Sequence, residues 1–140
     1  MNKARIVLGG VVAALINFFL DGALHSVLLR PYWMEIAESL HLRGDADAAS
    51  QFGYYIAYDL LKGMLSALIY ALIRPRLEPG LKTALVAGLI VWALVLPVPL
   101  LGLLPEGFFG SKFAILWSLY GAAPVLLGAV AGAALYKEEP

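Results

Sequence analysis

The sequence predicts an all-α integral membrane protein, a four-helix bundle with a short interfacial amphipathic helix after the first span. The first observation is composition, since 61% of the 140 residues are hydrophobic and only 14% are charged. A soluble domain is nearer 45–50% apolar and about 25% charged. The second is four apolar runs, each long enough to cross about 30 Å of hydrocarbon. The third is that these runs are continuous and do not alternate with period two, which favours helices over barrel strands.

The four runs form a single membrane domain that covers residues 1–140. The spans are expected at about residues 5–29, 54–73, 81–101 and 113–136. The first run follows Lys3 and Arg5, as the apolar part of a signal peptide would, but it is longer than the usual 7–15 residues and is interrupted by Asp21. We therefore expect it to be a retained span.

Basic residues gather on one side of the expected membrane topology. With the N-terminus inside, the cytoplasmic segments hold Lys3, Arg5, Arg74, Arg76, Lys82 and Lys137, and the opposite side holds Arg30, Arg43 and Lys112. Basic residues prefer the cytoplasmic side, so both termini are expected to be cytoplasmic. The formal net charge is zero, so no bulk attraction to nucleic acid is expected, and the apolar composition makes membrane lipid the expected partner.

The connection after the first span reads as an amphipathic helix. Pro31 suits its first turn, and apolar residues recur at helical spacing at Trp33, Ile36, Ala37 and Leu40. This helix is expected to lie in the outer interface. Asp45 or Asp47 would cap the helix that continues into the second span.

Proline and glycine mark the other two connections. The inner turn at residues 74–80 is expected to end one helix and start the next within a few residues. The outer connection mixes leucine and phenylalanine with Pro97, Pro99 and Pro105, and is expected to dip into the bilayer or cover the bundle end. Pro124 is expected to kink the fourth span.

Small residues mark faces where helices can approach closely. Lipid provides no hydrophobic force between spans, so close backbone packing must contribute to their association. The candidate packing residues are Gly9, Gly10, Gly88, Gly128 and Gly132. We expect them to pack helices of the same chain, with self-association as the alternative.

Six polar side chains interrupt the first two apolar runs at helical spacing. They are Asn17, Asp21 and His25 in the first run and Asp59, Lys62 and Ser66 in the second. In an antiparallel hairpin the residues that fall level are Asn17 with Ser66, Asp21 with Lys62, and His25 with Asp59. Ionisable side chains inside a span are rare, cost about 2.5–3.5 kcal/mol each on insertion scales, and need partners.

Three interpretations of this polar ladder stay open. It can fix the register of the hairpin, as buried ionic groups do in other proteins. It can form a proton or ion relay, or a polar pocket for a lipid or small solute, lined by Tyr55 and Tyr58 and open toward the outer face. It can also pair with polar groups of another membrane protein.

The sequence lacks the residue patterns of common enzyme active sites. The chain has no cysteine, and it lacks the P-loop, GxSxG, HExxH and dinucleotide-binding patterns, so we expect no enzymatic activity, metal or cofactor. A bis-histidine haem is not expected because His41 falls in the outer loop. Lipid chemistry would rest on His25 with Asp59, a pair without a nucleophile. An outer metal site would draw on His25, Glu35, Glu38, His41, Asp45 and Asp47, which lack a recognised ligand spacing.

Three short stretches carry a family resemblance. They are Leu20-Asp21-Gly22-Ala23-Leu24-His25 with the following segment to Trp33, the turn Ile73-Arg74-Pro75-Arg76, and the ending Ala134-Leu135-Tyr136-Lys137. The chain resembles small uncharacterised bacterial four-helix inner-membrane proteins. The resemblance implies a bacterial cytoplasmic membrane and carries no activity.

Small size and abundant small-residue faces predict a non-enzymatic accessory or scaffolding subunit that packs against other membrane helices. The alternative is a small oligomeric transporter, channel or ligand- or lipid-binding protein whose site is the intramembrane ladder of Asp, Lys and His.

Overall fold

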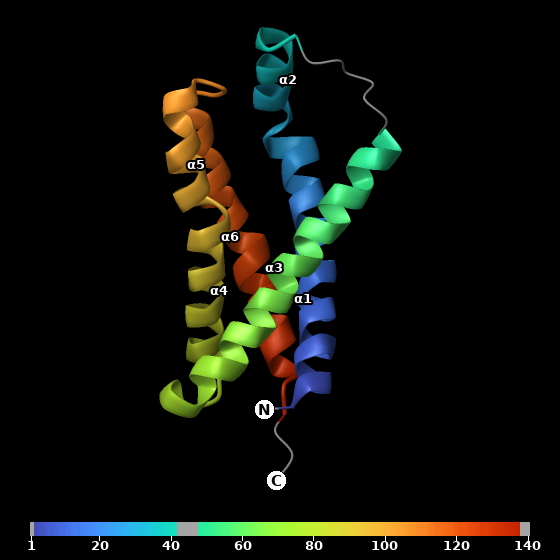
Figure 1. Cartoon of the computed structure of the whole chain (residues 1–140), viewed down its shortest axis with the longest axis vertical. Coiled ribbons are helices and arrows are strands. Elements are labelled where there is room, and N and C mark those ends of the chain that lie inside the picture. Colours follow the sequence, from blue (N-terminus) through green and yellow to red (C-terminus); the bar gives the residue numbers. More distant parts are fainter. Residues whose placement is uncertain (1, 42–47, 138–140) are drawn as a thin grey trace.

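The computed structural model describes residues 2–41 and 48–137, and within them the chain is all-α (Figure 1). Four long apolar segments pack as a bundle, with a short helix after the first, which confirms the predicted fold class. The elements are α1 (Lys3–Ala23), the π-helical turn η1 (Leu24–Leu28), α2 (Arg30–Ser39), α3 (Ala48–Leu77), α4 (Leu81–Val95), α5 (Pro97–Leu103), the 3-10 turn η2 (Leu104–Glu106) and α6 (Ser111–Ala134).

Four segments are long and apolar enough to cross a membrane. They are Lys3–Leu28, Gln51–Leu77, Leu81–Glu106 and Ser111–Ala134. The third span is longer than predicted because the proline-rich stretch is helical and is not a loop. Leu96 (φ −122°, ψ −81°) breaks the helix, and Pro97 starts α5. The first residue of a helix does not donate its N–H within the helix, so the missing N–H of proline costs nothing there. This stretch therefore extends the third span alongside α6 (Figure 1).

Glycines bring the helices into close contact inside the bundle. A Cβ added to Gly9 would lie 2.6 Å from the Gly132 carbonyl oxygen, and one added to Gly128 would lie 2.9 Å from that of Ala13. All five candidate packing glycines meet the same chain: Gly9 against Gly132, Gly10 against Met64, Gly88 against Ala129 and Leu126, Gly128 against Asn17 and Ala13, and Gly132 against Gly9 and Ala13.

The closest approach of α1 and α3 is at Gly63. A Cβ there would overlap the Gly10 carbonyl oxygen and would lie 2.8 Å from Ala14 Cα. Gly63 thus lies opposite residues 10–14 of the antiparallel helix α1. This contact sets how far α3 is shifted along α1, and it positions the polar residues on both helices.

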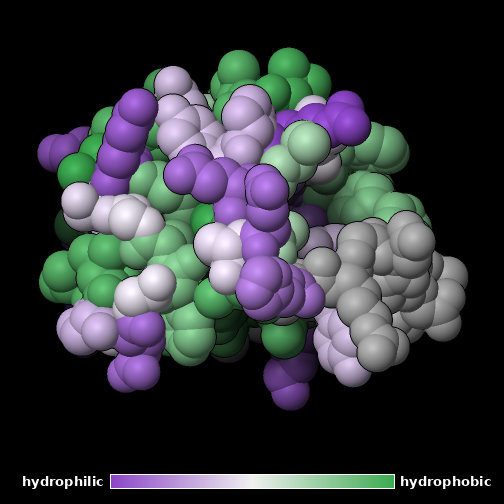
Figure 2. Space-filling model, turned by 90° about the horizontal axis from the view of Figure 1, so that it is seen from above, coloured by the Kyte–Doolittle hydropathy of each residue, from purple (hydrophilic) through white to green (hydrophobic). Residues whose placement is uncertain are grey.

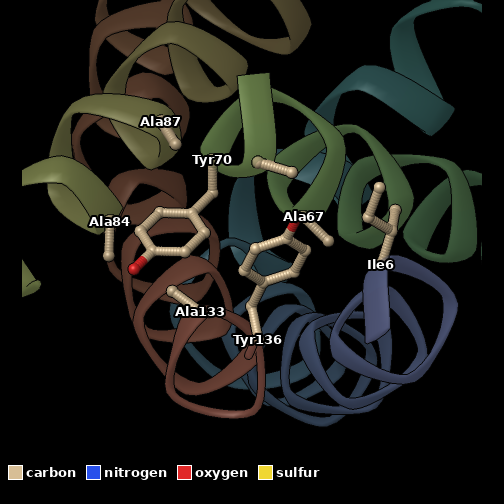
Figure 3. Close-up of a cluster of buried hydrophobic side chains, with 8 residues drawn as sticks. Ile6, Ala67, Tyr70, Ala84, Ala87, Ala133 and Tyr136 are labelled. Atoms are coloured by element: carbon tan, nitrogen blue, oxygen red, sulfur yellow. The ribbon is translucent and has the colours of Figure 1, made fainter. Parts of the chain in front are cut away.

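The end of the bundle opposite α2 is closed by an apolar cluster drawn from α1, α3, α4 and α6, together with Tyr136 just after α6 (Figure 3). Its members are Ile6, Ala67, Tyr70, Ala71, Ala84, Ala87, Ala133 and Tyr136. The rings of Tyr70 and Tyr136 meet edge-on with centroids 5.9 Å apart. Alanines around them allow the helices to approach, and the start of α1 and the end of α6 lie at this end of the bundle (Figure 1).

The turn predicted at residues 74–80 begins later than expected, because α3 runs through Pro75 to Leu77. Pro75 lies in the last turn of α3; it has no N–H to donate to the Ala71 carbonyl oxygen, and the helix ends two residues later. The reversal is made at Glu78 and Gly80, which have φ of 65° and 145°. The buried Thr83 hydroxyl donates to the carbonyl oxygens of Leu77 (3.1 Å) and Glu78 (2.6 Å) and so satisfies the end of α3.

The short helix α2 forms as predicted, but its orientation differs. Figure 1 shows α2 running along the long axis of the bundle, above η1, and not across it. Its apolar residues Tyr32, Trp33 and Ile36 pack around Phe113 at the start of α6, so this face is partnered by protein. The predicted caps Asp45 and Asp47 lie outside the described residues.

The glycine contact between α1 and α3 predicts a specific loss of stability. Gly63→Ala places a methyl group against backbone atoms of α1 and should destabilise the fold by about 1–3 kcal/mol. Unfolding in detergent micelles, followed by circular dichroism, measures the change. Gly22→Ala is the control, because a Cβ there meets nothing within 4 Å. Equal stability of the two variants would contradict the packing described here.

Candidate functional site

A buried charge cluster joins α1 to α3. The Lys62 ammonium contacts Asp21 Oδ2, and lies 2.6 Å from Asp59 Oδ1. The side chains of Lys62, Asp21 and Asp59 are 2%, 15% and 6% exposed. The ammonium also lies 4.7 Å from the ring centroid of Tyr58. Each charge in this cluster therefore has an opposite charge beside it, as charges inside a membrane span require.

Asp21 and Lys62 meet although their backbones are not level. Gly63 lies opposite residues 10–14, so Asp21 is about 10 Å further along α1 than the residues facing Lys62. Side chains on a helix lean toward its N-terminus. In antiparallel helices the Asp21 and Lys62 side chains therefore lean toward each other, and the length of the lysine bridges the offset.

The other two predicted pairs are not formed between the described residues. The buried Ser66 hydroxyl donates to the carbonyl oxygen of Lys62 in its own helix (2.9 Å), and Asn17 lies against Gly128 of α6. His25 accepts a hydrogen bond from Trp33 and makes none with Asp59. The offset between α1 and α3 explains both differences, because the predicted pairs assumed level backbones.

The cluster has unbalanced charge and unmet hydrogen-bonding capacity. With all three groups ionised, two carboxylates surround one ammonium, which leaves one excess negative charge. Asn17 lies one helical turn from Asp21 and is fully buried, and neither its amide oxygen nor its nitrogen has a hydrogen-bond partner among the described residues. A buried unpaired polar group costs about 1–3 kcal/mol. This polar interior could therefore accommodate a proton, a cation or a donor from another molecule.

His25 belongs to an aromatic cluster at the end of the bundle that carries α2. The Trp33 indole N–H donates to His25 Nδ1 at 2.8 Å, and the His25 ring meets Trp117 edge-on at 5.4 Å. An indole only donates, so His25 Nδ1 is the unprotonated nitrogen. His25 lies in the π-helical turn η1, a conformation that is frequent at functional sites. Trp33 follows His25 by eight residues across a helix break, so sequence spacing did not reveal this pair.

The remaining predicted residues take other positions. Tyr58 is beside the cluster and its hydroxyl donates to the Val95 carbonyl oxygen (3.1 Å), and both Tyr55 and Tyr58 are exposed. The Trp92 indole N–H donates to the Ser118 carbonyl oxygen (2.7 Å), and Trp117 packs in the aromatic cluster with His25 and Trp33. Within residues 2–41 and 48–137, no group of three or more His, Asp or Glu side chains could hold a metal ion.

These features define a four-span helical membrane protein with a charge cluster buried between its first two spans. No family model, no curated protein and no solved structure matches the chain.

Loss of the central cation should be more damaging than loss of the whole cluster. Lys62→Met leaves two facing carboxylates in a span and should destabilise the fold by about 3–5 kcal/mol. Adding Asp21→Asn and Asp59→Asn should restore most of that stability. Detergent unfolding measures all of these variants, with Lys82→Met at an exposed lysine as the control. A triple variant as unstable as Lys62→Met would show that charge balance is not the cause.

Proposed function

We propose that the protein is a non-enzymatic accessory or scaffolding subunit of a bacterial cytoplasmic membrane, with both termini cytoplasmic. In this proposal the charge cluster braces the first two spans against each other. The free surfaces of the bundle then pack against membrane helices of another protein.

The exposure of residues 51–58, in the outer half of α3, is the observation that carries this proposal. Every residue from 51 to 58 is exposed, although the segment belongs to the candidate span Gln51–Leu77. More than two helical turns thus stay exposed, although Phe52 meets Phe18 edge-on with ring centroids 5.3 Å apart and the Tyr58 hydroxyl donates to Val95. Figure 1 shows this half of α3 diverging from α1 and α2. The small-residue faces of α1 and α6 are occupied by each other, so among the described residues this part of α3 is the longest fully exposed helical segment.

The charge cluster next to this surface indicates which side chain a partner helix should carry. Asp21 keeps 15% of its side chain exposed and belongs to a group with one excess negative charge. A partner helix with a lysine, an arginine or a hydrogen-bond donor at that depth would balance the charge. We therefore expect the occupant to be a spanning helix of another protein that carries such a side chain.

Photo-crosslinking in native membranes tests the proposal. A photoreactive phenylalanine at Tyr54 or Ile56 should give a discrete protein adduct, whereas the same group at Leu119, which is 61% exposed on α6, should react with lipid. Asp21→Asn should reduce the adduct several-fold if the buried charge contributes to recognition. Adducts absent at both α3 positions, with a monodisperse monomer by native mass measurement after gentle extraction, would argue against an accessory subunit.

A second function is favoured by the excess carboxylate and the unpartnered amide of Asn17. A small oligomeric transporter, channel or ligand-binding protein could use this interior to take up and release a proton or cation. Asp21 is the most exposed member of the cluster and would be the point of entry.

Proton flux into proteoliposomes distinguishes this second function. With a potassium diffusion potential and a trapped pH-sensitive dye, the wild-type protein should acidify the lumen faster than empty vesicles do. Asp21→Asn should abolish the flux while circular dichroism and elution volume stay unchanged. Glu106→Gln is the control because Glu106 is exposed outside the cluster. Wild-type flux equal to that of empty vesicles would exclude proton transport under these conditions.

A further inference from the structure

A cavity of about 440 Å³ lies at the outer end of the bundle, between α2 and the turn that leads into α6. Its walls include Tyr32, Glu35, Ile36, Phe109, Lys112 and Phe113. The first candidate span ends at Leu28 and the fourth begins at Ser111, so the cavity lies at the level where lipid headgroups meet the protein. Figure 2 shows this end of the molecule, where hydrophilic and hydrophobic residues lie side by side.

The cavity carries one negative and one positive side chain on different helices. Glu35 comes from α2 and Lys112 from the first turn of α6. Among the described residues neither forms a salt bridge, so the two charges do not neutralise each other directly. The Lys112 ammonium lies 5.7 Å from the ring centroid of Tyr32, which keeps it beside the cavity. Each charge can therefore receive a ligand group of opposite sign.

The start of α6 strengthens the positive side of the cavity. Gly110 is the N-cap residue and provides no side-chain cap, so N–H groups of the first turn have no side-chain acceptor there. α6 has 24 residues, and its N-terminus adds a favourable potential for a phosphate next to Lys112. The volume falls within the roughly 300–1,000 Å³ of small-molecule sites, and aromatic walls are typical of them.

We propose that this cavity binds the phosphate–amine headgroup of a zwitterionic phospholipid. The phosphate would lie at Lys112 and the first turn of α6, and the amine at Glu35. Ile115 and Leu119 follow Lys112 at helical spacing, and they are 58% and 61% exposed. They provide an apolar path for an acyl chain into the bilayer. None of these residues belongs to the charge cluster or to the outer half of α3.

Native mass spectrometry with defined lipids tests the assignment. The protein, delipidated in detergent, is mixed with equal amounts of phosphatidylethanolamine and phosphatidylglycerol that carry the same acyl chains. The wild type should retain phosphatidylethanolamine at least about fivefold more than phosphatidylglycerol. Glu35→Gln should bring this ratio close to one, because the amine loses its partner while the phosphate keeps its own. Glu38→Gln, on the same helix but outside the cavity lining, should leave the ratio unchanged.

Two further measurements test the role of Lys112 and whether the bound headgroup belongs to a lipid. Lys112→Gln should lower retention of both lipids. Soluble phosphoethanolamine, at the concentration of the lipid, should not displace it, since it lacks the acyl chains that follow α6. Displacement by the soluble compound would overturn the lipid assignment. Equal retention of both lipids by the wild type, or equal ratios for Glu35→Gln and Glu38→Gln, would overturn the site itself.

Discussion

The contact of the Lys62 ammonium with Asp21 and Asp59 is the interaction on which the first half of the bundle depends. It is combined with the approach of Gly63 to Gly10, which sets the distance and the offset of α1 and α3. The glycines bring the backbones together where side chains are small, and the charges meet further along, where the helices begin to diverge. In lipid, packing and polar contacts have to take the place of the hydrophobic effect, and this hairpin uses both.

An imbalance within the same cluster links architecture to function. One ammonium lies between two carboxylates, and the amide of Asn17 has no hydrogen-bond partner among the described residues. Buried polar networks are usually fully satisfied, so this one is incomplete. A partner helix with a donor and a resident proton or cation are the two ways of completing it. Residues 51–58 of α3, all of them exposed, lie next to the cluster, and we propose that a partner helix packs there.

The sequence was sufficient for the features that depend on composition and spacing. The four spans, the short helix α2 and the meeting of Asp21 with Lys62 follow from apolar length, periodicity and charge. The offset of the helices could not be predicted, because it depends on which glycines touch and on how far a lysine side chain reaches. The partner of His25 was missed for a related reason, since a π-helical turn and a helix break separate it from Trp33.

The distribution of charge between the two helices also bears on how the chain enters the membrane. Asp59 and Lys62 are three residues apart on α3, so that helix carries its own counterion while it inserts. Asp21 has no cation within the apolar part of α1. Because synthesis proceeds from the N-terminus, α1 emerges from the ribosome with a carboxylate whose counterion has not yet been translated. The carboxylate of Asp21 therefore acquires its counterion only after α3 has been translated and has packed against α1.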